Sequence, residues 1–461
     1  MVRKLTIWIA SLTVAILMMA VTMAGAAHAQ DVLGDWHGVL SDSLSELRFG
    51  LQITAKPGGG YQGSISSPDQ LPGTLPLDSV TIENRRLIFS SDQIHARFEG
   101  DWDPVKNAWV GRWTQGNTGP LVLTKGKPDP RLRPQIPKPP FPYRAEDVSF
   151  DSAPGVRLAG TLTLPAGKGP FPAVVLITGS GAQDRDESLM DHKPFLVLAD
   201  ALSRRGIAVL RDDDRGFAKS TGDFSKATTL DFVVDTEAAL AFLRTRPEID
   251  AKRLGLIGHS EGGMIGPIVA TQDPGVGFVV MMAGPGVPIR DLMVAQRAAV
   301  ARTAGAPPET IAQNEVIMER VQKALVNASD PAQGQAAAVK VLTDKGMRPP
   351  AALATVKQLS SPWYTWFIAY DPGPTLSKLR IPVLAINGDK DVQVISKQSL
   401  PAIREALKND PDATVLELPG LNHLFQTAGT GAPLEYARIE ETISPTALNL
   451  MVDWVVAHTK P

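Results

Sequence analysis

Hydrophobic and polar residues alternate in short segments between residue 31 and about residue 125. Turn signals such as Pro57-Gly58-Gly59-Gly60 and Glu83-Asn84 separate the segments. Alternation with a period of two and closely spaced turns is typical of antiparallel strands with one buried face. The pattern predicts an all-β barrel or small sandwich over residues 30–125, with strands at Leu47–Thr54, Tyr61–Ser66, Ser79–Ile82, Arg86–Phe89, Ala96–Trp102, Ala108–Thr114 and Pro120–Thr124.

From residue 143 onward, short apolar runs alternate with stretches of helical length. Such alternation predicts an α/β domain over residues 143–461, in which a mostly parallel sheet has helices on both faces. An alanine-rich region, about 287–378, interrupts the rhythm and predicts an inserted helical cap. Strands are expected at Leu158–Leu164, Ala173–Thr178, Ile207–Leu210, Leu254–Ile257, Phe278–Ala283, Val383–Asn387 and Thr414–Leu418, and helices at Pro194–Arg205, Leu230–Thr245, Lys397–Leu407 and Pro445–His458.

The segment 126–142, between these two regions, contains seven prolines. Proline fixes φ and lacks a backbone N–H, so it is excluded from helix interiors and from the middle of sheets. We therefore predict a stiff, extended linker here, and with it the main domain boundary.

The first residues have the pattern of an export signal. Arg3 and Lys4 precede a mostly apolar run, and Ala27-His28-Ala29 provides small residues for cleavage before Gln30. We expect residues 1–29 to be a signal peptide rather than a retained membrane anchor, because the apolar run and its cleavage site fit removal better. No later stretch is long and apolar enough to span a bilayer. This interpretation predicts a periplasmic or secreted protein.

The composition narrows the class of protein. The chain has 461 residues, a formal net charge of −2 and no cysteine. A near-neutral charge argues against nucleic acid as a partner. The absence of cysteine excludes disulfides and thiolate metal sites, so the core alone must stabilise an exported fold.

The most informative motif is Gly258-His259-Ser260-Glu261-Gly262, which follows the apolar run that ends at Ile257. Gly-x-Ser-x-Gly between a strand and a helix is the pattern of a nucleophile elbow, in which the serine occupies a tight turn. We predict that Ser260 is the nucleophile and that the backbone amide of Glu261 is one donor of the oxyanion hole.

A serine nucleophile needs a base and an acid that orients the base. Of seven histidines, only His423 lies in the loop directly after the last expected strand, at the sheet edge where the base belongs. His259 lies in the elbow, and we expect its side chain to point away from the nucleophile's face. Asp391 in Gly388-Asp389-Lys390-Asp391 is the predicted acid, with Asp389 as the fallback and a turn-stabilising role for whichever is not used.

The loop after Ala173–Thr178 is expected to supply the second oxyanion donor. Gly181 allows the backbone to bend, so that the amide of Ala182 or of Gln183 points into the site. We predict Ala182 as the donor, with Gly181 and Gln183 near the substrate. The following Asp184, Arg185 and Asp186 are expected to brace the loop through ion pairs.

Three further groups of residues have a functional and a structural interpretation. Asp212-Asp213-Asp214 resembles a cation site, but no partner ligands occur at matching spacing, so we predict a loop buttressed by Arg215 and no metal site. In the cap, Trp363 and Trp366 are predicted to line the acyl site, although packing onto the sheet explains them equally well. Four tryptophans of the β domain either stack on sugars or fill its core, namely Trp36, Trp102, Trp109 and Trp113.

Residues 143–461 resemble the α/β-hydrolase superfamily, specifically bacterial exported carboxylesterases of the EstD type. The resemblance rests on motifs in the family's order, from Gly179-Ser180-Gly181-Ala182-Gln183-Asp184-Arg185-Asp186 through His192-Lys193-Pro194-Phe195, Asp213-Asp214-Arg215-Gly216 and Gly258-His259-Ser260-Glu261-Gly262-Gly263 to Gly388-Asp389-Lys390-Asp391 and His423. It implies the triad Ser260, Asp391 and His423, a helical cap and activity on short-acyl esters.

The sequence therefore predicts a serine carboxylesterase that acts on a small ester and requires no cofactor. One alternative is a peptidase or amidase that uses the same triad, since a fold does not determine the substrate. The other is an envelope-glycan-binding protein whose β domain contacts the cell envelope and whose hydrolase domain is residual.

Overall fold

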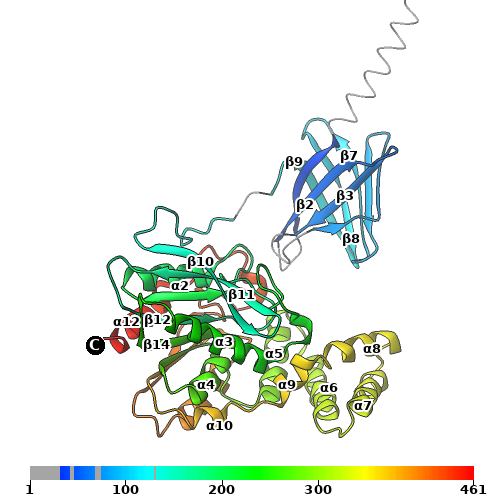
Figure 1. Ribbon diagram of the computed structural model, residues 1–461. Coiled ribbons are helices and arrows are strands. Elements are labelled where there is room, and N and C mark those ends of the chain that lie inside the picture. The colour runs from blue at the N-terminus through cyan, green and yellow to red at the C-terminus, as the bar shows by residue number, and fades with distance from the viewer. Residues whose placement is uncertain (1–31, 42–45, 68–73, 129–130, 461) are drawn as a thin grey trace, which may run out of the picture. The chain divides into compact units, whose positions relative to one another are not determined.

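The structure, a computed structural model, describes residues 32–41, 46–67, 74–128 and 131–460. The chain divides into two compact units, residues 1–131 and 132–461 (Figure 1). The expected signal peptide lies outside the described residues. Within the described part, no helix combines the length and the apolar character that a membrane crossing requires.

The described residues of the first unit form one nine-stranded antiparallel sheet in the order β4-β3-β2-β1-β9-β8-β7-β6-β5. The sheet curls, so that Leu77, which precedes β5, donates its amide to Gly63 of β3 at 2.9 Å. The predicted strands are present, and two unpredicted ones join them, β1 and β4. The strands are β1 (Gly34–Ser41), β2 (Glu46–Ala55), β3 (Tyr61–Ser66), β4 (Leu75–Pro76), β5 (Ser79–Glu83), β6 (Arg86–Ser91), β7 (Ala96–Asp103), β8 (Ala108–Gln115) and β9 (Asn117–Lys125).

Aromatic side chains fill the interior of this sheet. Phe89 stacks on Phe98 with ring centroids 5.0 Å apart. Trp36, Trp109 and Trp113 are buried, and Trp102 is partly buried and packs against the same cluster. A ring in the core has no free face for a sugar, so the packing interpretation of these tryptophans is confirmed.

The second unit is built on an eight-stranded sheet in the order β10-β11-β13-β12-β14-β15-β16-β17. The pairs β10–β11 and β11–β13 are antiparallel, and the strands from β13 to β17 are parallel. This is the α/β-hydrolase fold, as predicted. The strands are β10 (Arg144–Ala153), β11 (Val156–Leu164), β12 (Phe171–Ile177), β13 (Ala208–Asp212), β14 (Ile249–His259), β15 (Val276–Met282), β16 (Val383–Gly388) and β17 (Ala413–Leu418).

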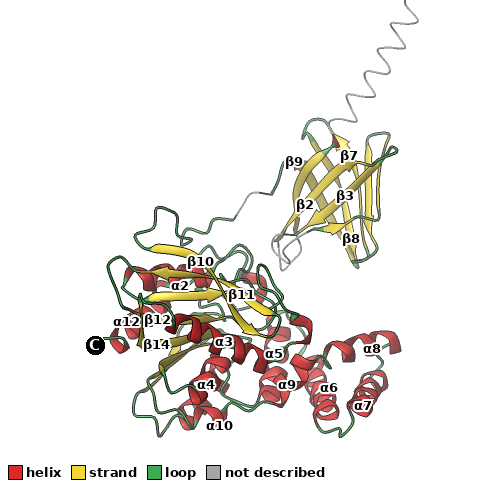
Figure 2. Cartoon of the chain, in the orientation of Figure 1, coloured by secondary structure: helices red, strands yellow, loops and turns green. Residues whose placement is uncertain are grey.

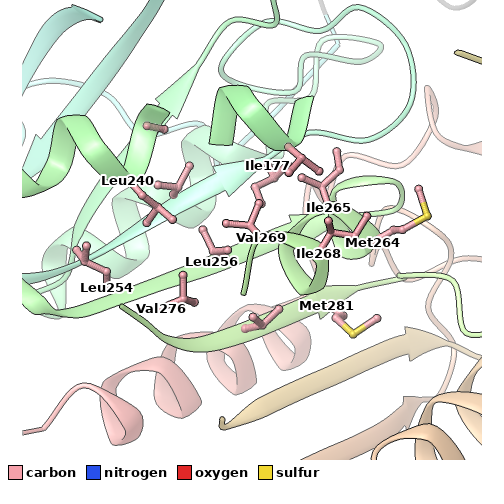
Figure 3. Packing of buried hydrophobic residues seen from close by; sticks show 14 of the residues in the cluster. Ile177, Leu240, Leu254, Leu256, Met264, Ile265, Ile268, Val269, Val276 and Met281 are labelled. Atoms are coloured by element: carbon pink, nitrogen blue, oxygen red, sulfur yellow. The ribbon is translucent and has the colours of Figure 1, made fainter. Parts of the chain in front are cut away.

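Helices cover both faces of this sheet because successive side chains of a buried strand point to opposite sides. Val174 and Leu176 pack under α2 (Pro194–Arg204) and α12 (Pro445–His458). The intervening Val175 and Ile177 pack under α3 (Thr229–Arg244) and α4 (Gly262–Gln272), and α11 (Ser396–Ala406) covers the same face over β16 and β17. Figure 3 shows Ile265, Ile268 and Val269 of α4 packed with Ile177 and Leu256. This packing fixes α4, which follows the elbow directly.

The cap is inserted between β15 and β16, in the region that the sequence indicates. Figure 2 shows α6, α7 and α8 as a group of helices at one side of the unit. Together with α9, they enclose a small hydrophobic core of their own. This core includes Val321, Leu342 and Ile368. The cap helices are α5 (Ile289–Thr303), α6 (Pro308–Val326), α7 (Pro331–Asp344), α8 (Pro349–Gln358), α9 (Pro362–Ala369) and α10 (Gly373–Leu376), and two 3-10 helices, Phe224–Lys226 and Pro433–Glu435, lie outside it.

The part of the proline-rich segment after residue 131 is docked on the hydrolase unit. The guanidinium of Arg133, which is 8% exposed, donates to the carbonyls of Met190, Ala437 and Ile439. Gln135 accepts from the amides of residues 442 and 443. This half of the segment thus holds the loop that precedes α12.

Candidate active site

The strand β14 delivers Ser260 to a tight turn that α4 follows. Ser260 has a φ of +53°, the left-handed conformation that a non-glycine residue adopts under constraint. Neighbouring backbone is very close: a Cβ on Gly258 would lie 1.9 Å from the carbonyl oxygen of Gly262, and a Cβ on Gly262 would lie 2.1 Å from that of Ile177. Only glycine fits at these two positions, so the predicted elbow geometry is present.

His423 lies in the loop after β17 and contacts Asp391, in the loop after β16. The distance from Nδ1 of His423 to Oδ2 of Asp391 is 2.7 Å, and both side chains are buried. Oδ1 of Asp391 accepts from the amides of Gln393 at 2.7 Å and Val394 at 2.9 Å. The carboxylate is therefore held in place, and it can keep the proton of His423 on Nδ1, which leaves Nε2 free to accept one.

The alternative acid, Asp389, has the turn role. Its Oδ1 accepts from the amide of Gly420 at 2.6 Å, which ties the loop after β16 to the turn before His423. Within the described residues, no hydrogen bond joins Ser260 to the ring of His423. Such contacts are often long in ligand-free enzymes and shorten when substrate binds.

The loop after β12 lies directly against the nucleophile. A Cβ on Gly179 would be 3.2 Å from Cβ of Ser260, and Gly181 has a φ of +99°. The amide of Gln183 is not available as an oxyanion donor, because it donates to Oδ2 of Asp214 at 2.7 Å. Among the residues that the structure describes, the amides of Ala182 and Glu261 donate to no backbone carbonyl.

The side chain of Glu261 connects the elbow to the cap. Its carboxyl is 2% exposed and accepts from the hydroxyl of Thr229 at 2.6 Å. Nε1 of Trp363, in α9, donates to Oε1 at 2.9 Å and to Oε2 at 3.1 Å. Trp366 instead stacks on Tyr370 with ring centroids 5.0 Å apart. The structure thus brings Trp363 to the elbow and packs Trp366 beside Tyr370 within the same helix region.

A cavity of about 30 Å³ behind the elbow is lined by several carboxyl groups. It has room for about one water molecule and is too small for an acyl chain. Burial, with the neighbouring carboxylates, raises the pKa of Asp212 well above its usual range. Burial also raises the pKa of Asp214 to about 8 and raises that of Glu261. These groups favour the neutral form, which limits the negative charge beside the oxyanion position.

The acidic residues of these loops serve as braces. Asp213 forms a buried ion pair with Arg185, with Nη2 and Oδ2 2.8 Å apart, and Asp186 pairs with Arg211. The predicted bracing by Arg185 and Asp186 is therefore confirmed. Arg215 pairs with Asp231 and Asp235 of α3. Among the described residues, no group of His, Asp or Glu side chains has the arrangement of a metal site.

The expected orientation of His259 is wrong. Its Nε2 lies 2.9 Å from the carbonyl oxygen of His423, and its ring centroid is 4.8 Å from that of His423. Nδ1 of His259 lies 2.8 Å from Oε1 of Glu187. Sequence reasoning missed Glu187, because no local pattern in the chain indicates that a carboxyl after the glycine loop faces a residue 72 positions later.

Comparison with known proteins identifies the family of the chain. The sequence profile of the family described as X-Pro dipeptidyl-peptidase (S15 family) matches residues 154–423. Esterase EstD of Thermotoga maritima is 28% identical over 318 residues, which cover 69% of this chain and 68% of that protein. The uncharacterized protein YfhR of Escherichia coli is 36% identical over 124 residues, 27% of this chain and 41% of that protein. The solved Pyrococcus furiosus esterase Pf2001 is 14% identical, with a TM-score of 0.44 over 73% of this chain and 100% of that one.

Proposed function

We propose that this protein cleaves short-acyl carboxylic esters through an acyl-enzyme on Ser260. The chain belongs to the X-Pro dipeptidyl-peptidase (S15) family and is a carboxylesterase-type serine hydrolase of the α/β fold. One observation carries the assignment of the site. Nδ1 of His423 lies 2.7 Å from Oδ2 of Asp391. In addition, the carbonyl of His423 contacts Nε2 of His259, the residue that precedes Ser260.

In the proposed reaction, Oγ of Ser260 attacks the ester carbonyl while Nε2 of His423 accepts its proton. Asp391 keeps the other ring nitrogen protonated and stabilises the imidazolium that forms. The tetrahedral oxyanion accepts hydrogen bonds from the amides of Glu261 and Ala182. His423 then protonates the leaving alkoxide, and a water molecule, activated by the same base, hydrolyses the acyl-enzyme and regenerates Ser260.

Two observations support a small substrate. The chain matches a relative named as an esterase over two thirds of its length. In addition, Trp363 of the cap is hydrogen-bonded to Glu261, the residue after the nucleophile, so the cap reaches the elbow itself. Gly181, Gln183, Trp363 and Trp366 are the residues that we propose to contact substrate.

The test is labelling with a fluorophosphonate, followed by peptide mapping, together with hydrolysis of p-nitrophenyl acetate. We expect a single adduct on the peptide that contains Ser260, and neither adduct nor turnover in Ser260→Ala. Full activity in a folded Ser260→Ala variant would contradict the assignment.

The family description favours one second candidate, cleavage of prolyl amides by the same triad. A comparison of Ala-Pro-p-nitroanilide with p-nitrophenyl esters decides between the two. A higher kcat/KM for the anilide would replace the esterase proposal with a peptidase.

We also propose that the protein is exported and that the β unit contacts the cell envelope. The N-terminal residue pattern supports the first part. Cell fractionation tests export, and co-sedimentation of the isolated β unit with peptidoglycan tests the contact, provided that circular dichroism shows the unit to be folded. Trp36, Trp109 and Trp113 are buried, so any such contact must use other side chains than these three.

A further inference from the structure

A buried histidine and carboxylate stand beside the candidate triad and have no role in the reaction described above. His259 is 5% exposed and Glu187 is 4% exposed. Glu187 lies in a left-handed conformation with a φ of +53°, in a turn where its amide donates to Asp184. A buried ionisable pair is costly unless its hydrogen bonds are satisfied, so its presence next to the site requires an explanation.

The pair joins three separate loops. Oε1 of Glu187 accepts from the amide of Gly179, at the start of the oxyanion loop, at 3.0 Å. The same oxygen lies 2.8 Å from Nδ1 of His259, which directly precedes Ser260. On its other side, Nε2 of His259 lies 2.9 Å from the carbonyl oxygen of His423. The loop after β12, the nucleophile elbow and the loop that contains His423 thus meet at the pair of His259 and Glu187.

The hydrogen-bond partners of His259 indicate which of its ring nitrogens carry a proton. A backbone carbonyl only accepts, so Nε2 of His259 must carry a proton. Oε1 of Glu187 accepts from the amide of Gly179 and also faces Nδ1 of His259. Burial alone would lower the pKa of His259, but the charge and hydrogen bond of Glu187, with the carbonyl of His423, outweigh burial and raise it. The surroundings of His259 therefore favour its imidazolium form.

We propose that Glu187 and His259 are positioning residues, which hold the main chain of His423 and the oxyanion loop in register with Ser260. The inference rests on the proposed function, because it concerns the geometry of that same triad. Ser260 follows β14 and His423 follows β17, three strands further along the sheet, and a hydrogen bond from His259 to the carbonyl of His423 fixes their separation. A displacement of about 1 Å in such a geometry costs about 100-fold in rate.

The test compares Glu187→Ala, His259→Ala and the double variant with the wild type on p-nitrophenyl acetate. We expect each single variant to lower kcat by about 10- to 100-fold. KM should stay within about twofold, because neither side chain is placed to touch substrate. The double variant should be hardly worse than either single one, since residues that act as a unit give non-additive losses. Glu187→Gln, which still accepts from Gly179, should recover part of the lost kcat.

Ser203→Ala is the matched control. It removes a buried hydrogen bond of 2.7 Å to Thr163, in the contact between α2 and β11 and away from the triad. It should lower stability toward urea but leave kcat unchanged, which separates a general structural effect from positioning.

The outcomes are distinct from those of the proposed function. A wild type that hydrolyses no ester or amide and takes no fluorophosphonate label would refute the proposed function, and the positioning role with it. A hydrolysing wild type with Glu187→Ala at normal kcat would overturn the positioning role alone. If Glu187→Ala does not fold, His259→Ala gives the same decision, and normal kcat there also overturns the proposal.

Discussion

Trp363→Phe tests whether the cap is attached to the elbow through the carboxyl of Glu261. The substitution removes the indole N–H, which lies 2.9 and 3.1 Å from the two carboxyl oxygens. It keeps an aromatic ring, so the stacking on Phe367, with ring centroids 4.8 Å apart, can persist. The change therefore isolates one hydrogen bond.

The expected effect follows from the surroundings of Glu261. A hydrogen bond to a charged group contributes about 1.5–3 kcal/mol, and one between neutral groups about 0.5–1.5 kcal/mol. Burial raises the pKa of Glu261, which moves the carboxyl toward the neutral form. Thr229 remains as a donor, so the carboxyl is not left unpaired. We therefore expect a loss of about 1–2 kcal/mol in the free energy of unfolding.

Urea unfolding followed by circular dichroism measures this loss, and a double-mutant cycle with Glu261→Ala measures the coupling between the two side chains. Hydrogen exchange of α9 should increase in the variant if the cap loosens, and kcat/KM should shift toward longer acyl chains. A variant within about 0.3 kcal/mol of the wild type, with additive effects in the cycle, would refute the reasoning.

Three other predictions concern the base, the docked segment and pH. In Asp391→Asn, the two backbone amides that bind Oδ1 should keep the side-chain oxygen on their side and turn the side-chain NH₂ toward His423, which moves the ring proton to Nε2. We expect kcat to fall by about 10³–10⁴. A loss below tenfold in stopped-flow assays would contradict this. Arg133→Ala leaves the carbonyls of Met190 and Ala437 without a donor, so it should destabilise the hydrolase unit by about 1–3 kcal/mol. Hydrogen exchange at 437–443 should become faster. Unchanged exchange would show that the proline-rich segment does not hold the loop before α12. The pKa of Asp214 is about 8 in the folded chain against an ordinary 3.8, so the folded state binds the extra proton between these values and stability falls as pH rises. His192, whose pKa is lowered from 6.5 to about 4, acts in the opposite direction below pH 6.5. Between pH 6.5 and 8, the free energy of unfolding measured with urea should therefore decline in the wild type. It should decline less in Asp214→Asn, by about 1 kcal/mol per pH unit, and equal slopes would refute the assignment.

The periodicity of the sequence predicted strands well where it reflects burial. Every second residue of β6, and of β7 as far as Gly100, is buried, and the parallel strands of the hydrolase unit are continuous apolar runs, so both kinds were recognisable. β10 was missed because it pairs only with β11 at the edge of the sheet, and most of its residues are polar and face solvent. β1 was missed because His37 and Gly38 interrupt its apolar pattern.

For the site, the sequence determined those roles that depend on local backbone. Ser260 could be predicted because a left-handed turn between glycine residues, after a strand and before a helix, is encoded within a few residues. Asp391 and His423 could be predicted because parallel strands end at one edge of the sheet, so the loops after them converge.

Only the tertiary structure decided which groups use the remaining hydrogen bonds. It assigned the amide of Gln183 to Asp214, the indole of Trp363 to Glu261 and the ring of His259 to Glu187 and His423. These contacts join loops, or the cap and the elbow, across tens to hundreds of residues. Each depends on the side-chain orientations that packing imposes, and the order of residues along the chain does not specify those orientations.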